Sequence, residues 1–258
     1  MTKHTAILAA SFGTACPEAI ARAIAPVEDK LAQHTGLTVR RAFTSEAVRS
    51  RLMREHGMQV YGIPDALEAL HREGFESVMV QPLMLMPGGE YARLTDCIRT
   101  DAAGLCITIA DPLIRCEEDM DEILQALVEA CPLDNETILV AMAHGSAHDT
   151  DGLYAALGRR LAGFKRPAAL CTIHGEPSFE TLAARLSKQP RRNVHMFPFL
   201  LFPGMHAREN MCGMRPNSLR SILAAAGFEL TWSLRGLCEL PDVQELFVRR
   251  AQAALDNF

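Results

Sequence analysis

The chain has 258 residues, enough for one large domain or two of medium size. Hydrophobic residues make up 48% and charged residues 22%, which is typical of a soluble globular protein, and no window reaches the roughly 18 apolar residues of a membrane span. A formal net charge of −5 gives no basic footprint, so we expect neither a nucleic-acid partner nor a membrane. The first apolar run lacks a signal-peptide cleavage pattern and recurs inside the chain, so it is interpreted as a core strand.

Strand-like and helix-like stretches alternate along the whole chain. Continuous apolar strands alternating with helices predict an α/β fold of two similar doubly wound lobes, each with a mainly parallel four-stranded sheet flanked by helices. The expected strands are 5–11, 37–43, 76–86, 106–114, 137–143, 168–173, 193–202 and 228–234. The expected helices begin at Pro17 and continue with 46–56, 64–73, 90–103, 118–131, 150–163, 178–187, 206–226 and 241–256.

The break at 132–136 predicts the boundary between the lobes, giving an N-terminal lobe of residues 1–132 and a C-terminal lobe of residues 133–258. The last helix could pack back on the first lobe. No Gly-x-Gly-x-x-Gly follows the first strand and no Walker loop is present, so we expect no nucleotide cofactor. The eight cysteines are scattered without a Cys-x-x-Cys pair, which indicates reduced thiols and a cytoplasmic location.

One segment occurs twice, and its copies differ at their ends. Residues 78–90 read VMVQPLMLMPGGE, and residues 194–206 read VHMFPFLLFPGMH. Their prolines and first glycine align without a gap at an offset of 116 residues, which places Glu90 opposite His206. A repeat of about half the chain indicates duplication of a lobe rather than a solenoid.

Two further matches occur in the same order along the chain. Residues 7–14 resemble residues 138–146, which opposes Phe12 to His144. A shorter match sets residues 41–46 against 170–174 and opposes Glu46 to His174. The second lobe therefore carries a histidine at each of three positions where the first does not.

Ligands of open α/β sheets bind beyond the carboxyl ends of the strands. That rule predicts one functional edge in each lobe, at the following residues: Ser11, Phe12, Thr14; Thr44, Ser45, Glu46; Pro87 to Glu90; His144 to Ser146; His174 to Glu176; and Pro203 to His206.

Histidines from three separate strand ends could hold one divalent ion with open coordination positions. Imidazole suits cobalt, iron, nickel and zinc, and it could also accept protons near neutral pH. The alternative is that these are ordinary loop histidines, and His148 is an alternative ligand to His144. Glu90 and Glu176 are candidate bases, although Glu90 could simply be a carboxylate at a helix start.

These motifs resemble the anaerobic cobalt chelatases of cobalamin synthesis, the CbiK-type sirohydrochlorin cobaltochelatases of the class II chelatases. The resemblance covers essentially the whole chain. It is carried by Ser11-Phe12-Gly13-Thr14, residues 41–45 and 87–91, His144-Gly145, and residues 198–207. It implies a bilobal fold that inserts a divalent metal into a tetrapyrrole without ATP, with the metal as substrate.

The resemblance also implies a metal site. His144 and His206 match the two histidines of the family, and the glutamate of many members falls on His174 here, followed closely by Glu176. Either His174 is a third nitrogen ligand or Glu176 supplies the carboxylate, and we favour His174. This departure leaves cobalt and iron both open as the metal. His144, His206 and Glu90 are the expected catalytic residues, with an imidazole or Glu90 receiving the pyrrole protons.

By the same resemblance, sirohydrochlorin is the expected partner, held in a cleft between the lobes. The expected substrate-binding residues are Ser11, Phe12, Thr14, Thr44, Ser45, Leu85, Met86, Pro87, Gly88, Phe202 and Pro203. The main alternative is a metal-binding or delivery protein without catalysis. A two-lobed solute receptor normally carries a signal peptide, and a hydrolase using Ser11 or Ser146 would need a Gly-x-Ser-x-Gly that is missing here. The sequence does not indicate the oligomeric state, and a homo-oligomer is compatible with it.

Overall fold

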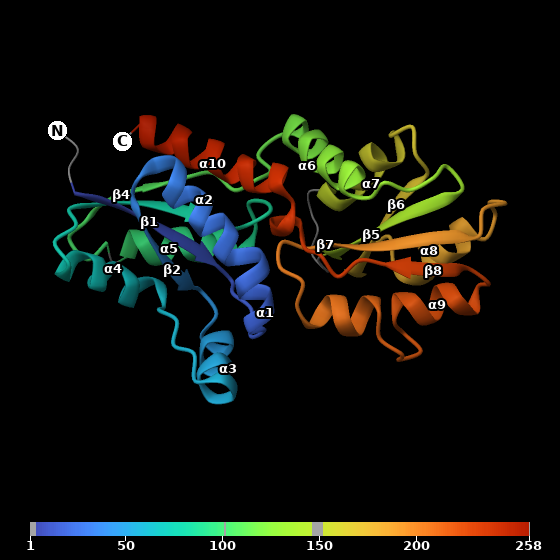
Figure 1. The fold of residues 1–258 in the computed structure, drawn as a ribbon, viewed down its shortest axis with the longest axis horizontal. Helices are drawn as coiled ribbons and strands as arrows, with labels where there is room; N and C mark the ends of the chain where they lie inside the picture. The colour runs from blue at the N-terminus through green and yellow to red at the C-terminus, as the bar shows by residue number, and fades with distance from the viewer. Residues whose placement is uncertain (1–3, 101, 146–151, 258) are drawn as a thin grey trace. The chain divides into compact units, whose positions relative to one another are not determined.

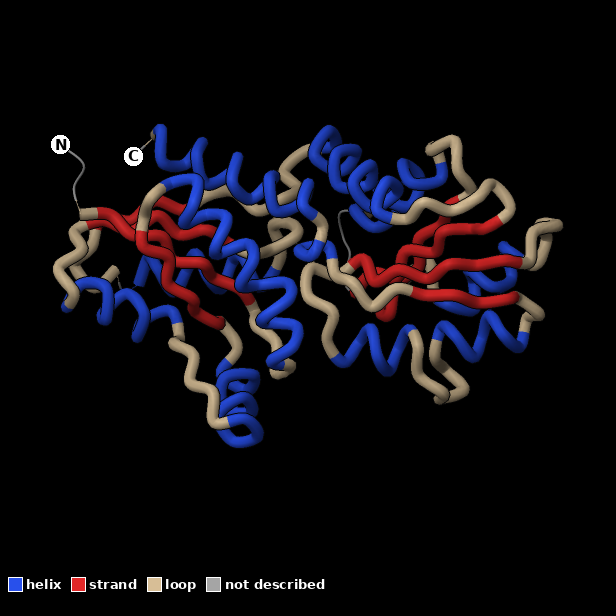
Figure 2. The backbone as a smooth tube through the Cα atoms, viewed as in Figure 1, coloured by secondary structure: helices blue, strands red, loops and turns tan. Residues whose placement is uncertain are grey.

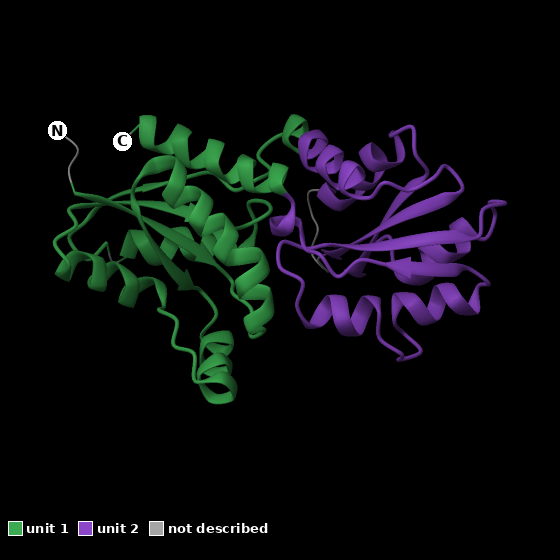
Figure 3. Ribbon diagram, viewed as in Figure 1, with its two compact units in different colours: residues 1–119, 241–258 green, residues 120–240 purple. Residues whose placement is uncertain are grey.

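The computed structural model describes residues 4–100, 102–145 and 152–257, and the chain divides into two compact units (Figure 3). Unit 1 comprises residues 1–119 and 241–258, and unit 2 comprises residues 120–240. The boundary predicted after residue 132 instead falls inside unit 2, because most of helix α6 (Glu117–Ala130) belongs to that unit. No helix in the described ranges has the length and apolar character needed to cross a membrane.

Unit 1 is built on a fully parallel sheet with the strand order β2-β1-β3-β4 (Figure 1). Its strands are β1 (Thr5–Ser11), β2 (Thr38–Phe43), β3 (Ser77–Pro82) and β4 (Cys106–Ile109). Its helical elements are α1 (Pro17–Ala19), the π-helical turn η1 (Ile20–Ile24), α2 (Ala25–Thr35), α3 (Glu46–His56), α4 (Ile63–Arg72), α5 (Gly89–Thr100) and α10 (Pro241–Asp256).

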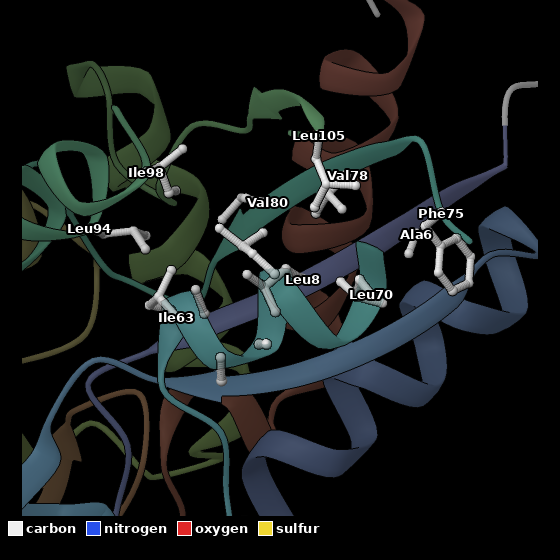
Figure 4. Close-up of a cluster of buried hydrophobic side chains, with 14 of the residues drawn as sticks. Ala6, Leu8, Ile63, Leu70, Phe75, Val78, Val80, Leu94, Ile98 and Leu105 are labelled. Carbon is white, nitrogen blue, oxygen red and sulfur yellow. The ribbon is translucent and has the colours of Figure 1, made fainter. Parts of the chain in front are cut away.

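Helices cover both faces of the first sheet. Alternate residues of β1 and β3, including Leu8 and Val80, point into a buried cluster with Ile63 of α4 and Leu94 of α5 (Figure 4). The other face is covered by α2 and by the returning helix α10, which contacts α2 and β3. Each fully buried side chain of this kind contributes roughly 1.5–3 kcal/mol, so this two-sided core explains why the strands are apolar throughout.

Unit 2 repeats the design with the parallel order β6-β5-β7-β8 (Figure 1), and helices flank its strands (Figure 2). Its strands are β5 (Thr137–Gly145), β6 (Ala168–His174), β7 (Asn193–Phe199) and β8 (Glu229–Trp232). Besides α6, its helical elements are α7 (Leu153–Ala162), α8 (Phe179–Leu186), the π-helical turn η2 (His206–Met211), α9 (Leu219–Ala225) and the 3-10 turn η3 (Leu237–Glu239).

Strand register supports the duplication inferred from sequence. Ala10 of β1 lies opposite Pro82 of β3, and Met142 of β5 lies opposite Pro198 of β7. The offsets between these pairs are those of the two longer sequence matches. The fold prediction of two four-stranded parallel sheets flanked by helices is confirmed.

The shortest sequence match is wrong by one residue. Ala10 also pairs with Ala42, whereas Met142 pairs with Cys171. Counting on from these pairs, His174 corresponds to Ser45 rather than to Glu46. Side chains alternate between the two faces of a strand. An alignment that is wrong by one residue therefore matches side chains that point to opposite faces.

The single helix predicted over residues 206–226 is also wrong. The π-helical turn η2 ends at Met211, and α9 begins only at Leu219. A Cβ at Gly213 would lie 2.2 Å from the Glu209 carbonyl oxygen, so the chain turns at a residue that has no side chain. The break limits His206 to a short turn of its own.

Several strands are shorter than predicted. The strand expected over 76–86 ends at Pro82, and the one expected over 193–202 ends at Phe199. Leu83 and Met84 nevertheless stay buried beyond the end of β3. The apolar residues after Pro82 therefore indicate that the loop beyond the strand is buried. They do not indicate that its backbone pairs with a neighbouring strand.

Candidate functional site

Three histidines of unit 2 come together at the carboxyl edge of its sheet. The ring centroids of His144 and His174 are 5.2 Å apart with an interplanar angle of 59°, and those of His144 and His206 are 5.1 Å apart at 84°. His144 lies near the end of β5, His174 ends β6, and His206 begins η2. All three residues are exposed, so the edge predicted from the strand-end rule presents a cluster of imidazoles to solvent.

Gly145 allows the ends of β5 and β6 to approach closely enough for this contact. Its φ is +73°, and a Cβ at this position would lie 1.9 Å from the His174 carbonyl oxygen and 2.6 Å from the Thr172 Cβ atom. A side chain would collide with the backbone of the neighbouring strand, where little can shift. The spacing of the His144 and His174 rings therefore depends on the glycine between them.

Oxygen atoms contact the Nδ1 atoms of two of the rings. The Nδ1 of His144 lies 3.0 Å from the Gly145 carbonyl oxygen, and the Nδ1 of His206 lies 2.9 Å from Oδ1 of Asn210. An acceptor at Nδ1 favours the tautomer that carries its proton there. The Nε2 atom then has a free lone pair, which is the state in which histidine binds a metal.

The π-helical turn η2 presents His206 at the surface while anchoring itself in the core. Ala207 and Met211 are fully buried, and the Cys212 N–H donates to the Ala207 carbonyl at 3.2 Å, the i+5 bond of a wide turn. Such turns are rare and occur frequently at functional sites. The buried pair fixes the turn, and the turn carries both His206 and Asn210.

The pKa of His144 is lowered. Desolvation by the surrounding protein is the largest cause, although the residue is exposed at the strand end. The hydrogen bond to the Gly145 carbonyl opposes the shift, and the nearby His206 and His174 rings lower the pKa further. His144 is therefore neutral at neutral pH, with a lone pair available.

The cluster is not a preformed metal cage. Within the described ranges, no three His, Cys, Asp or Glu side chains are arranged so that they could hold a metal ion as they stand. The rings of the cluster meet at steep angles of 59° and 84°. Binding one ion to all three would require the rings to turn until their nitrogen atoms converge.

Glu176, the alternative third ligand, is engaged elsewhere. Its Oε2 accepts a hydrogen bond from the Ser178 N–H at 3.0 Å, just before α8 begins. The Thr172 N–H of β6 donates to the Pro177 carbonyl at 2.9 Å, and this bond holds the loop that follows β6 against the strand. Of the two candidates, His174 is the one in contact with His144.

Two residues named from the sequence, Ser146 and His148, lie outside the described residues.

Glu90 occupies the corresponding place in unit 1, as the second residue of α5. Arg93 donates to its Oε1 at 2.8 Å, and the Thr44 hydroxyl donates to its Oε2 at 3.3 Å. The Glu90 side chain keeps 37% of its surface exposed. The carboxylate is thus held in place by two donors and still reaches solvent.

The other predicted substrate-binding residues differ in how far their side chains are exposed and in whether they are already hydrogen-bonded within the protein. Ser11 is buried, and the Thr14 and Ser45 hydroxyls accept bonds from the N–H groups of Cys16 and Val48. The ring of Phe12 is 47% exposed. The strand-exit residues are half-buried or exposed: Leu85, Met86, Pro87, Gly88, Phe202 and Pro203.

Sequence reasoning missed Asn210 and gave Arg93 no role at Glu90. Both could have been found from spacing, because Asn210 follows His206 by four residues and Arg93 follows Glu90 by three, and side chains so spaced meet on a helical turn.

Two solved structures of chelatases share this fold. SirB from Bacillus subtilis with Fe3+ superposes with a TM-score of 0.71 at 18% identity, covering 98% of this chain and 96% of that one. CbiX, described as the terminal enzyme for biosynthesis of siroheme in denitrifying bacteria, gives 0.59 at 19% identity, covering 96% of this chain and 99% of that one. These likenesses define the fold as that of a two-lobed chelatase.

Within that class, the sequence model of the cobalt chelatase (CbiK) family matches residues 5–256, and the chain belongs to this family. It is 28% identical to the sirohydrochlorin cobaltochelatase of Salmonella typhimurium over 254 residues, which is 97% of this chain and 96% of that protein. It is also 28% identical to the sirohydrochlorin cobaltochelatase CbiKC of Nitratidesulfovibrio vulgaris over 225 residues, covering 85% of this chain and 79% of that protein.

Proposed function

We propose that the protein is a sirohydrochlorin chelatase that inserts cobalt(II), with iron(II) as the alternative metal, in a reaction that uses no ATP. One observation supports this most directly: in a member of the cobalt chelatase family, the imidazoles of His174 and His206 both lie against that of His144 at the carboxyl edge of one sheet. Imidazole nitrogen is a good ligand for both metals. A cytoplasmic location is part of the proposal.

The histidines would present the metal to the tetrapyrrole. His144 and His206 already have oxygen atoms at Nδ1, so their Nε2 atoms are free to bind, and His174 would add a third nitrogen. A surface cluster that must reorient to converge suits an ion that is passed on rather than kept. The metal would exchange these ligands for pyrrole nitrogens one at a time.

Insertion of one divalent ion releases two protons from pyrrole N–H groups, so the reaction needs proton acceptors. A neutral imidazole is one, and His144 is held neutral by its lowered pKa. The carboxylate of Glu90 is the other, oriented by Arg93 and Thr44. The half-buried residues Leu85, Met86 and Phe202 would contact the apolar faces of the macrocycle.

The test is a direct assay of the purified protein with sirohydrochlorin and either cobalt(II) or iron(II). We expect an absorbance change faster than in the uncatalysed mixture, and the ratio of the two initial rates gives the metal preference. Rates equal to the uncatalysed ones, together with tight metal binding, would instead identify a metal-delivery protein.

The role of His174 can be separated from that of Glu176 in the same assay. We expect His174→Ala to weaken cobalt binding or change the cobalt-to-iron rate ratio, because it removes one of three nitrogen donors. Glu176→Gln is the matched control, since its carboxylate contacts the Ser178 backbone. A changed ratio in Glu176→Gln alone would assign the third ligand to Glu176.

A further inference from the structure

A pocket in unit 2 lies at the opposite end of the sheet from the histidines. It has a volume of about 390 Å³ and is formed where β5 and β6 begin, by residues that include Ile138 and Ala168. Ile138 and His144 are six residues apart on one strand, which corresponds to roughly 20 Å. The pocket is therefore separate from the proposed metal site.

The charged residues that line this pocket all carry the same sign. They are Lys165 and Arg166 from the loop before β6, Arg185 from the end of α8, and Arg191 from the loop before β7. Among the residues that the structure describes, no aspartate or glutamate lines this pocket. Apolar side chains, Phe164 and Leu186 among them, complete the wall. Four cations gathered in one pocket are unexpected in a chain whose net charge is −5.

Two of the arginines are oriented by the protein backbone. The Arg191 Nε donates to the Asn135 carbonyl at 2.9 Å, and an Arg166 guanidinium N–H donates to the Cys131 carbonyl. Each guanidinium has five N–H donors, so several remain available for an anion. The pKa of Asp134 is lowered mainly by its hydrogen bond with Thr137 and least by Arg166, so this carboxylate does little to neutralise the group.

A comparison within the same molecule shows that this arrangement is not the rule. A larger pocket in unit 1, of about 720 Å³, is lined by Arg49 and Arg72 among other residues, but acids line it too. Arg49 lies 3.9 Å from Asp65, and Arg72 lies 3.7 Å from Glu68. The positive charge there is balanced within the pocket, and in the unit 2 pocket it is not.

We propose that the pocket of Lys165, Arg166, Arg185 and Arg191 binds a small organic polyanion that carries clustered phosphate or carboxylate groups. Guanidinium groups recognise both kinds of oxyanion through paired hydrogen bonds. The volume falls in the range of small-molecule sites, and the apolar wall accommodates a carbon body beside the charged groups. This site is independent of the proposed chelatase activity.

The experiment is calorimetric titration of the metal-free, full-length protein with pyrophosphate and with citrate, at constant ionic strength set by chloride. We expect saturable one-to-one binding of at least one of them. Tighter binding of pyrophosphate identifies a phosphate-bearing ligand, and tighter binding of citrate identifies a polycarboxylate. Absence of saturable binding for both would overturn the proposal.

Variants test whether the pocket itself is responsible. Arg185→Gln and Lys165→Gln should each lower the affinity for the anion about tenfold, because each removes about one charge-assisted hydrogen bond. Lys188→Gln is the matched control, because this exposed lysine follows α8 closely but does not line the pocket. Metal insertion should be unchanged in all three. An equal loss of affinity in Lys188→Gln and Arg185→Gln would show general charge attraction and reject the site.

Discussion

The two sheet edges of this protein share a backbone plan and differ in chemistry. Both units place their strands in the same order, and Ala10–Pro82 in unit 1 matches Met142–Pro198 in unit 2. At the carboxyl edge, unit 2 gathers three imidazoles, with those of His174 and His206 both lying against that of His144. Unit 1 instead presents the exposed ring of Phe12 and the paired carboxylate of Glu90.

This difference shows that residues within the strands and residues just beyond the strands are under different constraints. Strand residues must fill a two-sided core, so both copies stay apolar. Residues just beyond the strands are free of that demand, and a substitution there changes function at little cost in stability. An edge with clustered imidazoles and an edge without them could therefore arise from one duplicated lobe.

Removing the imidazoles of unit 2 should have the largest effect on activity. We expect His144→Ala and His206→Ala each to lower the rate of metal insertion by at least about a hundredfold, the effect of losing a group that acts on the reacting atoms. Both residues are exposed, so the folded state should survive. The measurement is the initial rate of insertion, with circular dichroism to confirm the fold.

His195→Gln is the matched control for those variants. His195 lies in the middle of β7, with its Nδ1 2.8 Å from the Thr231 hydroxyl, and it has no place in the cluster. Its replacement should leave the rate near that of the unaltered protein. Near-normal turnover in His144→Ala or His206→Ala would refute their assignment.

A second test leaves every histidine in place and removes the geometry that gathers them. Gly145→Ala puts a Cβ atom 1.9 Å from the His174 carbonyl oxygen and should cost more than about 3 kcal/mol, with loss of metal binding. Gly227→Ala is a matched control, because Gly227 has φ +82° but no atom within 4 Å of an added Cβ. It should cost only about 1 kcal/mol. Equal losses in urea denaturation would show that backbone strain, not the collision, matters at Gly145.

The units also differ in continuity, since unit 1 is completed by the returning helix α10. Asp119 holds that helix: its carboxylate accepts bonds from the Arg115 N–H and from Arg250 on α10. Burial alone would raise the pKa of Asp119, but these hydrogen bonds outweigh it and hold the pKa at about 2. A lowered pKa stabilises the folded state above the pKa of the unfolded chain, near 3.8, and this stabilisation is lost as pH falls toward 2.

Asp119→Asn should therefore remove about 2 kcal/mol at pH 7 and flatten the decline in stability between about pH 4 and 2. Asp111→Asn, which alters an exposed partner of Arg115, should change stability by less than about 0.5 kcal/mol. Urea denaturation at several pH values measures both. An unchanged acid profile in Asp119→Asn would mean that other carboxylates govern the acid sensitivity.

The α/β fold with two similar lobes could be predicted from the sequence, because the alternation of apolar strands with helices and the internal repeat both follow from the need to fill a buried core. The sequence predicted that the three histidines lie at one edge, because His144 and His174 stand at strand ends and His206 is the counterpart of Glu90 in the repeat. It could not predict how η2 ends, since helical spacing continued through residues 206–226 while Gly213 and the close Glu209 carbonyl stop the turn. Asn210 is a different case, because its spacing of four residues from His206 already indicated that the two side chains meet on one turn.

Asn210 offers the finest test of the difference between the two edges. Its Oδ1 atom lies 2.9 Å from the His206 Nδ1, so we expect it to position His206 rather than to bind the metal itself. Asn210→Leu should weaken cobalt binding about tenfold, the lower end of the effect of such supporting contacts, whereas Asn210→Asp keeps an acceptor and should retain affinity. Nitrogen-15 NMR of the His206 ring reports the tautomer, which should shift only in the leucine variant. If the tautomer stays unchanged in Asn210→Leu while affinity falls, the contact serves the shape of η2, and the orientation of His206 must come from its place in the π-helical turn alone.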